Sequence, residues 1–236
     1  MERFLRSEAI DYEQVMFGTP GGKVLSKMEI NDVFRFLDAK LSELILDVGT
    51  GSGRIAREIV SKTKANVIGI DVGRLMIESA KMRKGNLSGY EMIVADGQYL
   101  PFKNESFDAI VCIRTVKYFP NYISGISDMV RVLKLNGRFV VDLSSVLGYE
   151  TILRYITHSS SARESHVFNF YKLRTLLSQE ELLVVDSLPL QKIPHKIWNL
   201  FTNSTILQLL VACENVLRKI TPLILSRSIL LKCIKS

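Results

Sequence analysis

A glycine-spaced turn between residues 44 and 54 constrains this chain more than any other feature. The stretch LILDVGTGSGR begins as a buried-type strand at Leu44–Val48, passes through Gly49, Gly51 and Gly53, and enters a helical pattern at Arg54. Glycine adopts positive φ angles readily and has no side chain to block a ligand. A helix that starts at such a turn points backbone N–H groups at its ligand. The stretch therefore predicts a strand–turn–helix unit that holds a nucleotide-like cofactor.

Short apolar segments alternate with helical patterns around this turn. Strands are predicted at Leu44–Val48, Asn66–Asp71, Tyr90–Asp96, Phe107–Ile113 and Arg138–Leu143. Helices are predicted at Arg54–Ser61, Gly73–Lys84 and Asn121–Lys134. This alternation is typical of an α/β fold with a mostly parallel sheet covered on both faces, and right-handed crossovers make such a sheet doubly wound.

The flanking segments are predicted to complete the same domain. Residues 1–40 form an N-terminal arm and lid, which ends in a helix at Lys27–Leu37. Residues 41–143 form the ligand-binding core, and 144–236 form a cap insertion followed by the C-terminal part of the domain. In that last part, residues 228–235 are predicted to be a final edge strand whose lysines discourage further pairing.

Composition limits the class of protein. A chain of 236 residues with 47% hydrophobic and 23% charged residues can bury the core of one domain. Cys112, Cys213 and Cys233 form no CxxC pair, and the three histidines lack metal-ligand spacing. We therefore expect no metal site and no disulfide framework, and a reducing compartment, the cytoplasm. Neither a secretory signal nor a membrane-spanning run of about 20 apolar residues is predicted.

The net charge of +7 is concentrated toward the C-terminus, where seven Lys/Arg and one acid, Glu214, follow Ser187. A solvated basic face accounts for this pattern, and peripheral contact with an anionic membrane is the alternative. Nucleic acid is disfavoured because the basic residues are dispersed and lack interleaved aromatics. One apolar helix face is expected to pack on the sheet or a partner, or to enter lipid: Ile206, Leu209, Leu210, Cys213, Leu217 and Ile220.

Two cofactor classes compete for the glycine turn, since a Walker A motif is absent. Gly51, Gly53 and Ala56 satisfy the dinucleotide spacing, and Asp71 lies 20 residues after Gly51. However, counting from the glycine that ends the strand puts Arg54 where close packing needs a small residue. A further acid, Asp96, ends the third strand, where a single adenosine could use it. The nicotinamide alternative remains open at this point.

Four segments, in order and spacing, carry a family resemblance: ILDVGTGSGR, VIGIDVGRLMIESAK, VADGQYLPFKNESFDAIVC and MVRVLKLNGRFVV. Together they resemble class I S-adenosylmethionine-dependent methyltransferases, particularly the small-molecule branch of quinone biosynthesis. The resemblance covers roughly Tyr12–Leu143. It implies a seven-stranded Rossmann-like sheet with an antiparallel last strand. It also implies S-adenosylmethionine as cofactor and in-line methyl transfer to a small acceptor, which can be hydrophobic.

The resemblance also implies roles for the strand-end residues. Asp71 would accept hydrogen bonds from the ribose hydroxyls, and Asp96 with Gly97 would contact the adenine amino group. Asp47 would either hold the turn or face the cofactor ammonium. The predicted cofactor-binding residues are Asp47, Gly49, Thr50, Gly51, Gly53, Asp71, Val72, Asp96, Gly97, Cys112 and Ile113.

The acceptor is expected above the carboxyl ends of the strands, beneath the N-terminal arm. Its candidate contacts are Tyr12, Glu13, Phe17, Lys117 and Tyr118. No catalytic residue is predicted, because alignment of an acceptor with an already activated methyl group can drive the reaction. Two alternatives remain: a nicotinamide-dependent oxidoreductase, and a cofactor-binding module without catalysis.

Overall fold

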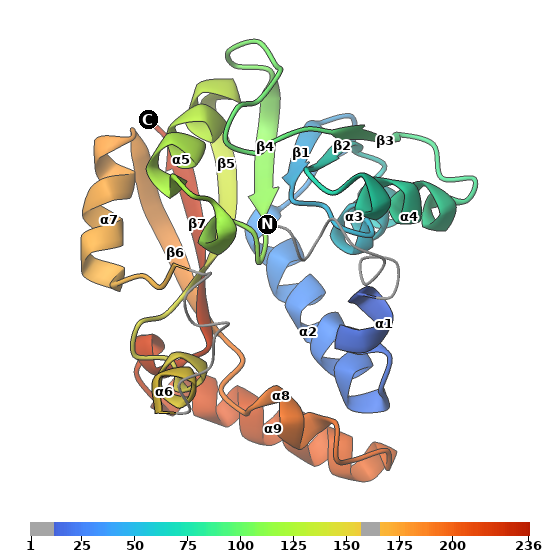
Figure 1. Cartoon of the computed structure of the whole chain (residues 1–236), viewed down its shortest axis with the longest axis vertical. Coiled ribbons are helices and arrows are strands. Elements are labelled where there is room, and N and C mark those ends of the chain that lie inside the picture. Colours follow the sequence, from blue (N-terminus) through green and yellow to red (C-terminus); the bar gives the residue numbers. More distant parts are fainter. Residues whose placement is uncertain (1–11, 157–165) are drawn as a thin grey trace.

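One seven-stranded sheet runs through the molecule, and the computed structural model describes residues 12–156 and 166–236 (Figure 1). The strands are β1 (Leu44–Val48), β2 (Asn66–Asp71), β3 (Tyr90–Val94), β4 (Phe107–Cys112), β5 (Leu133–Ser144), β6 (Leu182–Leu190) and β7 (Ser228–Lys235). They lie in the order β3-β2-β1-β4-β5-β7-β6. The pairs among β1 to β5 are parallel, and β7 is antiparallel to both its neighbours. The predicted doubly wound α/β fold is confirmed.

Helices cover both faces of this sheet. They are α1 (Tyr12–Phe17), α2 (Pro20–Leu37), α3 (Arg54–Thr63), α4 (Arg74–Lys84), α5 (Tyr122–Val132), α6 (Tyr149–Ile156), α7 (Phe170–Gln179), α8 (His195–Trp198) and α9 (Ser204–Ile220), with short 3₁₀ turns η3 (Val116–Tyr118) and η5 (Leu223–Leu225). On one face, α5 and α7 bury Met129 and Leu177. On the other, α2, α3 and α4 bury Phe36, Ile59 and Ile77. Apolar side chains on both faces explain why the strands read as continuous hydrophobic runs.

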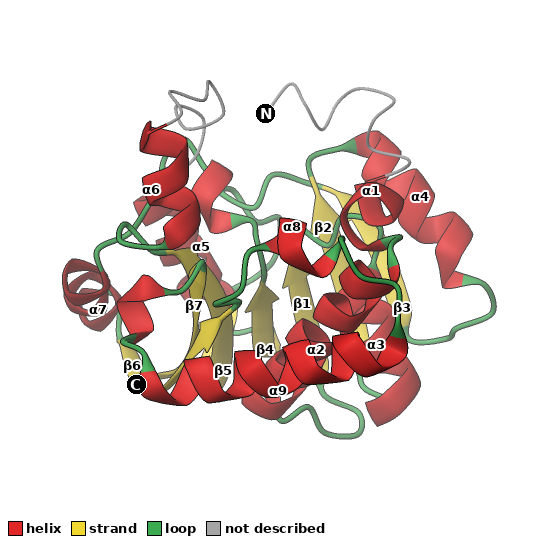
Figure 2. Ribbon diagram, turned by 90° about the horizontal axis from the view of Figure 1, so that it is seen from below, coloured by secondary structure: helices red, strands yellow, loops and turns green. Residues whose placement is uncertain are grey.

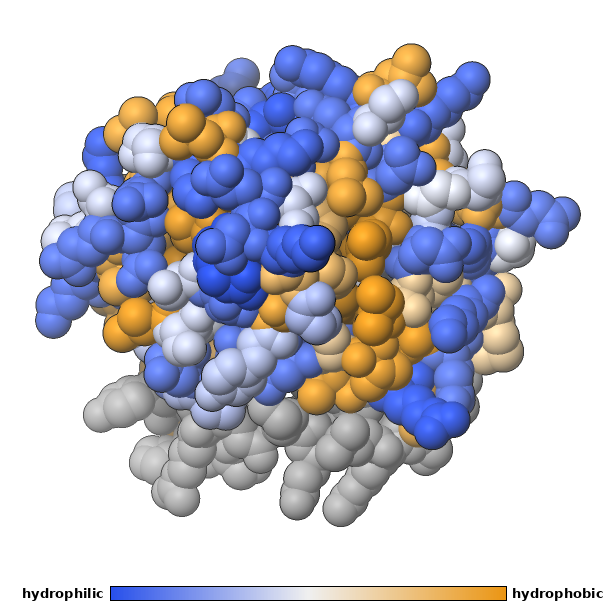
Figure 3. Space-filling model, turned by 90° about the horizontal axis from the view of Figure 1, so that it is seen from above, coloured by the Kyte–Doolittle hydropathy of each residue, from blue (hydrophilic) through white to orange (hydrophobic). Residues whose placement is uncertain are grey.

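A group of helices lies beyond the carboxyl ends of the parallel strands. Figure 1 shows α6, α8 and α9 below the sheet, and Figure 2 shows α8 and α9 crossing this side of the molecule. The opposite end, seen in Figure 3, is mainly hydrophilic, with an apolar strip and several smaller apolar patches. The segment after β5 therefore covers the end of the sheet where ligands of α/β proteins bind.

The N-terminal arm contains a longer helix than the sequence predicts. Helix α2 begins at Pro20, not Lys27, and the Thr19 hydroxyl accepts a hydrogen bond of 2.9 Å from Gly22 N. Two glycines in the first turn conceal this start, since glycine is a poor helix former. Gly21 has a packing role here: a Cβ at this position would lie 2.0 Å from the carbonyl oxygen of Trp198 in α8.

The prediction that residues 228–235 form an edge strand is wrong. β7 lies inside the sheet, paired along its length with β5 and β6, and β6 is the edge strand. The predicted role of the lysines changes accordingly. Lys235 is buried, and its Nζ donates to the carbonyl oxygens of Val130 and Leu133, at 3.0 and 2.9 Å. This lysine thus satisfies backbone acceptors where α5 ends.

The apolar face predicted for α9 is divided. Leu210 and Leu217 pack against the cluster around Trp198, whereas Leu209 and Ile220 are 62% and 71% exposed. The inward face also carries the fully buried Glu214, which accepts hydrogen bonds from the backbone of residues 192 and 193. The predicted face therefore mixes core and surface positions. In the described parts of the chain, no helix is both long and apolar enough to span a bilayer.

The basic C-terminal stretch is not one continuous surface. Arg218 pairs with Asp32 at 2.7 Å, and Arg227 pairs with Glu150 at 3.0 Å. The side chains of Arg218, Arg227 and Lys235 are only 10–12% exposed. Three of the seven basic residues are therefore used inside the fold.

Candidate functional site

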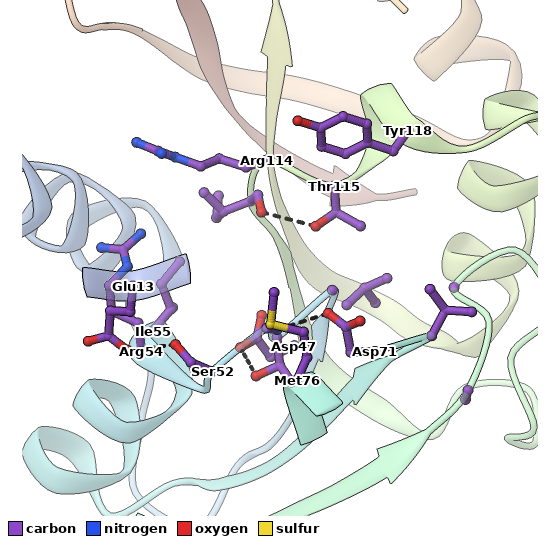
Figure 4. Close-up of a pocket in the computed structure, with 18 of the residues that line it drawn as sticks. Glu13, Asp47, Ser52, Arg54, Ile55, Asp71, Met76, Arg114, Thr115 and Tyr118 are labelled. Carbon is purple, nitrogen blue, oxygen red and sulfur yellow. Dashed lines mark hydrogen bonds between the residues drawn. The ribbon is translucent and has the colours of Figure 1, made fainter. Parts of the chain in front are cut away.

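A pocket lies at the carboxyl ends of β1, β2 and β4 and contains about 1090 Å³ of empty space, counting its mouth. Its floor comes from the ends of these strands and from the loop after β3, and α1 forms one wall. In Figure 4 the acids Asp47 and Asp71 lie on the side opposite Arg114 and Tyr118. The two sides differ in charge, because carboxylates dominate one and an arginine belongs to the other.

The glycine turn leaves space on its pocket side. Gly49, Gly51 and Gly53 have φ angles of +73°, +56° and +79°. A Cβ on Gly49 would lie 2.1 Å from the Thr115 hydroxyl oxygen, and one on Gly53 would lie 2.5 Å from the Tyr90 hydroxyl oxygen. A Cβ on Gly51 would meet no heavy atom within 4 Å. Packing therefore requires glycine at positions 49 and 53. The open space beside Gly51 is called the cradle below.

Asp71 lies at the end of β2, beside this cradle. Its carboxylate accepts hydrogen bonds from Gly51 N at 3.0 Å and from Gly73 N at 2.8 Å. Burial raises the pKa of Asp71 above its usual value, while these two N–H groups act against the increase. A carboxylate has about four acceptor positions, so two remain for a ligand. The two backbone bonds fix the orientation in which Asp71 presents them.

Asp96 follows β3 and belongs to the same floor. Its Oδ1 accepts from Gln98 N at 2.9 Å, and Gln98 in turn accepts from Asn121 N at 2.9 Å, where α5 begins. The neighbouring Gly97 allows close packing, since a Cβ there would lie 2.7 Å from the ring of Phe119. These contacts fix the loop that presents Asp96 to the pocket.

Asp47 is almost entirely buried, at 2% exposure, and it supports the turn. Its Oδ2 accepts from the Thr50 hydroxyl at 2.7 Å, and the Thr50 and Tyr90 hydroxyl oxygens are 2.9 Å apart. Burial raises the pKa of Asp47 to about 6, although the Thr50 hydrogen bond lowers it. Two roles were predicted for Asp47. Its hydrogen bond with Thr50 supports the role of holding the turn. Asp47 also lines the pocket, where a ligand contact stays a prediction.

Helix α1 is attached to the glycine turn through Glu13. The Ser52 hydroxyl donates to Glu13 at 2.6 Å, and the Arg57 guanidinium lies 3.3 Å away. Burial alone would raise the pKa of Glu13, but the Ser52 hydrogen bond and the Arg57 charge together lower it. Glu13, expected as an acceptor contact, lines the pocket while it holds α1 in place.

One glutamate and two arginines form buried ion pairs next to the pocket, and the sequence analysis did not predict them. Glu29 of α2 is 8% exposed and binds both Arg54 and Arg114, the latter at 2.7 Å. Both guanidinium groups also lie over the ring of Phe17, at 4.4 and 4.9 Å from its centroid. Burial would raise the pKa of Glu29, but Arg114 and Arg54 hold it at about 2. The only sequence signal is spacing: Glu29 lies four residues from both Leu25 and Val33, on the side of α2 that is buried, but this pattern does not indicate its arginine partners.

Most predicted ligand residues meet in this one pocket. It is lined by nine of the predicted cofactor residues: Asp47, Gly49, Thr50, Gly51, Asp71, Val72, Asp96, Gly97 and Ile113. Gly53 packs on Tyr90 and Cys112 is fully buried in the core, so both lie outside the lining. Of the acceptor candidates, Glu13, Phe17 and Tyr118 line the pocket. Tyr12 is placed only as the first residue of α1, and Lys117 is buried beside Tyr118.

Comparison with known proteins identifies the segment that builds the pocket. Residues 46–141 match the sequence family described as methyltransferase domain. This segment is a methyltransferase domain. The domain confirms the predicted resemblance to class I S-adenosylmethionine-dependent methyltransferases, a class defined by that cofactor.

Sequence relatives agree with this domain. A ubiquinone/menaquinone biosynthesis C-methyltransferase from Geotalea daltonii is 34% identical over 138 residues, which are 56% of this chain and 53% of the relative. The chain spans about half or less of the length of the curated relatives it matches, from 40% to 53% for three of them.

Solved structures share the fold of the methyltransferase domain and its flanking segments. An S-adenosylmethionine-dependent methyltransferase from Thermotoga maritima, described as a possible histamine N-methyltransferase, has a TM-score of 0.69 at 13% identity, with 100% of both chains covered. A geranyl diphosphate C-methyltransferase from Streptomyces coelicolor, solved with Mg²⁺, geranyl diphosphate and S-adenosylhomocysteine, has a TM-score of 0.69 at 12% identity, covering 89% of this chain and 77% of that one.

Proposed function

We propose that this protein transfers the methyl group of S-adenosylmethionine to a small, largely apolar acceptor. One observation carries the proposal: Asp71 and Asp96, at neighbouring strand ends, line the same pocket as the open cradle at Gly51. A ligand with one adenosine and a short cationic tail matches these groups. The curated quinone-biosynthesis relatives support a small-molecule acceptor.

The donor set of the pocket fits this cofactor. Asp71 has acceptor positions left for two ribose hydroxyls, and charge-assisted hydrogen bonds of this kind contribute roughly 1.5–3 kcal/mol each. Asp96 can accept from the adenine amino group, with the Gly97 backbone beside it. The empty Cβ position of Gly51 leaves room for the tail. When bound, S-adenosylmethionine supplies an electrophilic methyl group on a positively charged sulfur.

The chain itself orients the acceptor and excludes water. Phe17, Tyr118 and Phe119 give the pocket aromatic lining, with Tyr118 on the side opposite Asp47 and Asp71. Helix α1, fixed by Glu13 to Ser52, closes one side of the pocket. Orientation of two reactants in this way can contribute roughly 7–11 kcal/mol to a rate. The pocket therefore needs no covalent intermediate for the proposed transfer.

Replacing Asp71 with alanine is expected to weaken cofactor binding by more than tenfold, because the ribose acceptor is lost. Isothermal titration with S-adenosylhomocysteine measures the effect. Asp186→Ala is the matched control, since Asp186 is exposed in β6, away from the pocket, and should leave affinity unchanged. Equal affinity for the wild type and Asp71→Ala, with both proteins folded, would remove Asp71 from the proposed ribose site.

The side chain of Arg54 argues against the nicotinamide alternative. A dinucleotide turn that starts at Gly49 would need a small residue at position 54 for close helix–strand packing. Arg54 instead extends to Glu29 in α2. Titration with NAD separates the two cofactors, and tight binding of NAD alone would contradict the proposal. A module without catalysis would bind S-adenosylhomocysteine but turn over no acceptor.

Two further parts of the proposal concern the protein's surroundings. Free Cys112, Cys213 and Cys233 support a cytoplasmic location, which stays a prediction. Peripheral contact with an anionic membrane also stays a prediction, supported by exposed Leu209 and, near the end of α9, exposed Lys219 and Ile220. The domain limits 1–40, 41–143 and 144–236 are likewise retained as proposed divisions of one domain.

A further inference from the structure

Lys117 is a buried cation whose position the proposed transfer does not explain. It lies in η3, directly after β4, and is 8% exposed. Its Nζ lies 5.1 Å from the ring centroid of Tyr118, a residue that lines the pocket. Among the described residues, no carboxylate forms an ion pair with this Nζ and no acceptor forms a hydrogen bond with it. A buried charge without a partner is costly, so its presence requires a reason.

Two other buried polar groups among the described residues also have no hydrogen-bond partner. The Tyr149 hydroxyl of α6 and the Gln191 Nε2 after β6 are buried and have no hydrogen-bond partner in the described structure. Gln191 is fixed by its other amide atom, Oε1, which accepts from Arg227 at 2.9 Å. Native proteins rarely leave buried polar atoms unpaired, and such atoms therefore point to a missing ligand. All of these groups can donate a hydrogen bond.

Arg227 connects these groups. It donates to Gln191 Oε1 at 2.9 Å and pairs at 3.0 Å with Glu150, the residue after Tyr149. Burial and the nearby charge of Arg227 together lower the pKa of Lys117 to about 8, while Asp142 and Glu150 act in the opposite direction. Burial raises the pKa of Tyr149, where Arg227 and Glu150 also act. We call Lys117, Tyr149, Gln191 and Arg227 the donor cluster.

Lys117 differs from the other cations near the donor cluster in its contacts. Arg54, Arg114 and Arg227 each form an ion pair, whereas Asp142 and Glu150 act on Lys117 only as nearby charges. Glu29 is shared by two arginines, and Glu150 pairs with Arg227. Asp142 Oδ1 already accepts from the backbone N–H of Arg114. Lys117 is therefore the cation of this group without an ion-pair partner in the described chain.

We propose that the donor cluster binds an oxyanion, either a carboxylate or a phosphate, carried by the methyl acceptor. An oxyanion accepts hydrogen bonds, which matches a set of unpaired donors, and it would give the Lys117 ammonium an ion-pair partner. Arg114 and Tyr118 connect the cluster to the pocket, because both line it. The apolar part of the acceptor then lies in the pocket beside Tyr118. This inference rests on the proposed function, since it specifies the acceptor class.

The binding experiment uses the full chain saturated with S-adenosylhomocysteine. Phenyl phosphate, benzoate and benzamide, which share one ring and differ in charge, are titrated by calorimetry. We expect at least one anion to bind tenfold or more tightly than benzamide, and which anion does so separates phosphate from carboxylate. Binding of benzamide as tightly as both anions, or no binding of either anion, would overturn the inference. Failure of S-adenosylhomocysteine to bind would instead overturn the proposed function.

Variants locate the anion. Lys117→Met is expected to weaken anion binding at least tenfold while affinity for S-adenosylhomocysteine stays unchanged. Lys103→Met, at an exposed lysine between β3 and β4, is the matched control and should bind anions as the wild type does. Equal anion affinity in Lys117→Met and wild type would place the anion elsewhere, for example among the surface lysines Lys23 and Lys27.

Thermal unfolding gives an independent readout. Lys117→Met should raise the melting temperature by several degrees, because it removes a buried charge without a carboxylate partner. The preferred anion should raise the melting temperature of the wild type and leave that of the variant unchanged. If Lys117→Met does not fold, Lys117→Arg keeps the charge and should retain anion binding within about threefold. Loss of anion binding in folded Lys117→Gln and retention in Lys117→Arg would support the inference, and the reverse pattern would refute it.

Discussion

Replacing Glu29 with glutamine is expected to lower the free energy of unfolding by about 3–5 kcal/mol. The carboxylate is the shared partner of Arg54 and Arg114, whose side chains are 13% and 12% exposed. Glutamine would leave two buried guanidinium groups beside the pocket without their negative partner. Urea denaturation followed by circular dichroism measures the loss.

The matched control for this substitution is Glu58→Gln. Glu58 forms an exposed pair with Lys62 at 2.8 Å, one turn away on α3. Exposed pairs of this kind contribute about 0.3–0.5 kcal/mol, so the control should remain close to the wild type. Equal losses in both variants would mean that burial adds nothing to the Glu29 interaction.

The same residue predicts a dependence of stability on pH. The pKa of Glu29 falls from 4.5 to about 2 on folding, a difference that corresponds to about 3 kcal/mol. Because the folded value is the lower one, this stability is fully present above pH 4.5. It is lost as the pH falls from 4.5 toward 2. Urea titrations across this range should show a steeper decline for the wild type than for Glu29→Gln.

Replacing Gly49 with alanine is expected to cost several kcal/mol of stability. A φ angle of +73° costs an L-residue about 1–2 kcal/mol. The new Cβ would also lie 2.1 Å from the Thr115 hydroxyl oxygen, and overpacking of this kind costs typically 1–3 kcal/mol more. Chemical denaturation measures the sum, and replacing Thr115 with glycine in the same chain should restore part of it.

Gly51→Ala is the matched substitution in the same turn. Its φ angle is also positive, at +56°, but its Cβ would meet nothing within 4 Å. It should therefore lose only the backbone part, about 1–2 kcal/mol, while filling the cradle. We expect Gly49→Ala to lose mainly stability and Gly51→Ala to lose mainly affinity for S-adenosylhomocysteine. The opposite distribution would contradict the placement of the ligand at Gly51.

The sequence predicts those features that depend on neighbouring residues. β1 and β2 have the predicted bounds because each is an apolar run that ends in an acid or a glycine turn. The strand-end acids Asp71 and Asp96 are found in one pocket because parallel strands end at the same edge of a sheet.

Contacts between residues that are far apart in the sequence could not be predicted from local patterns. Glu29 lies 25 and 85 residues from Arg54 and Arg114, and nothing in the local pattern connects them. An isolated acid in a helix ordinarily indicates a solvent-facing position. The predicted edge-strand role of Lys235 was wrong for the same reason, since its partners Val130 and Leu133 lie more than 100 residues earlier. Sheet order likewise follows from long-range pairing, which periodicity does not encode.

The interior position of β7 has a consequence for how the chain folds as it is synthesised. β6 is made first, yet it contacts the rest of the sheet only through β7. Until residues 228–235 emerge, the outer edge of β5 stays open and β6 has no strand to join. An open strand edge is a template for aggregation. The growing chain therefore has an aggregation-prone interval between the synthesis of β5 and that of β7, during which the edge of β5 is exposed.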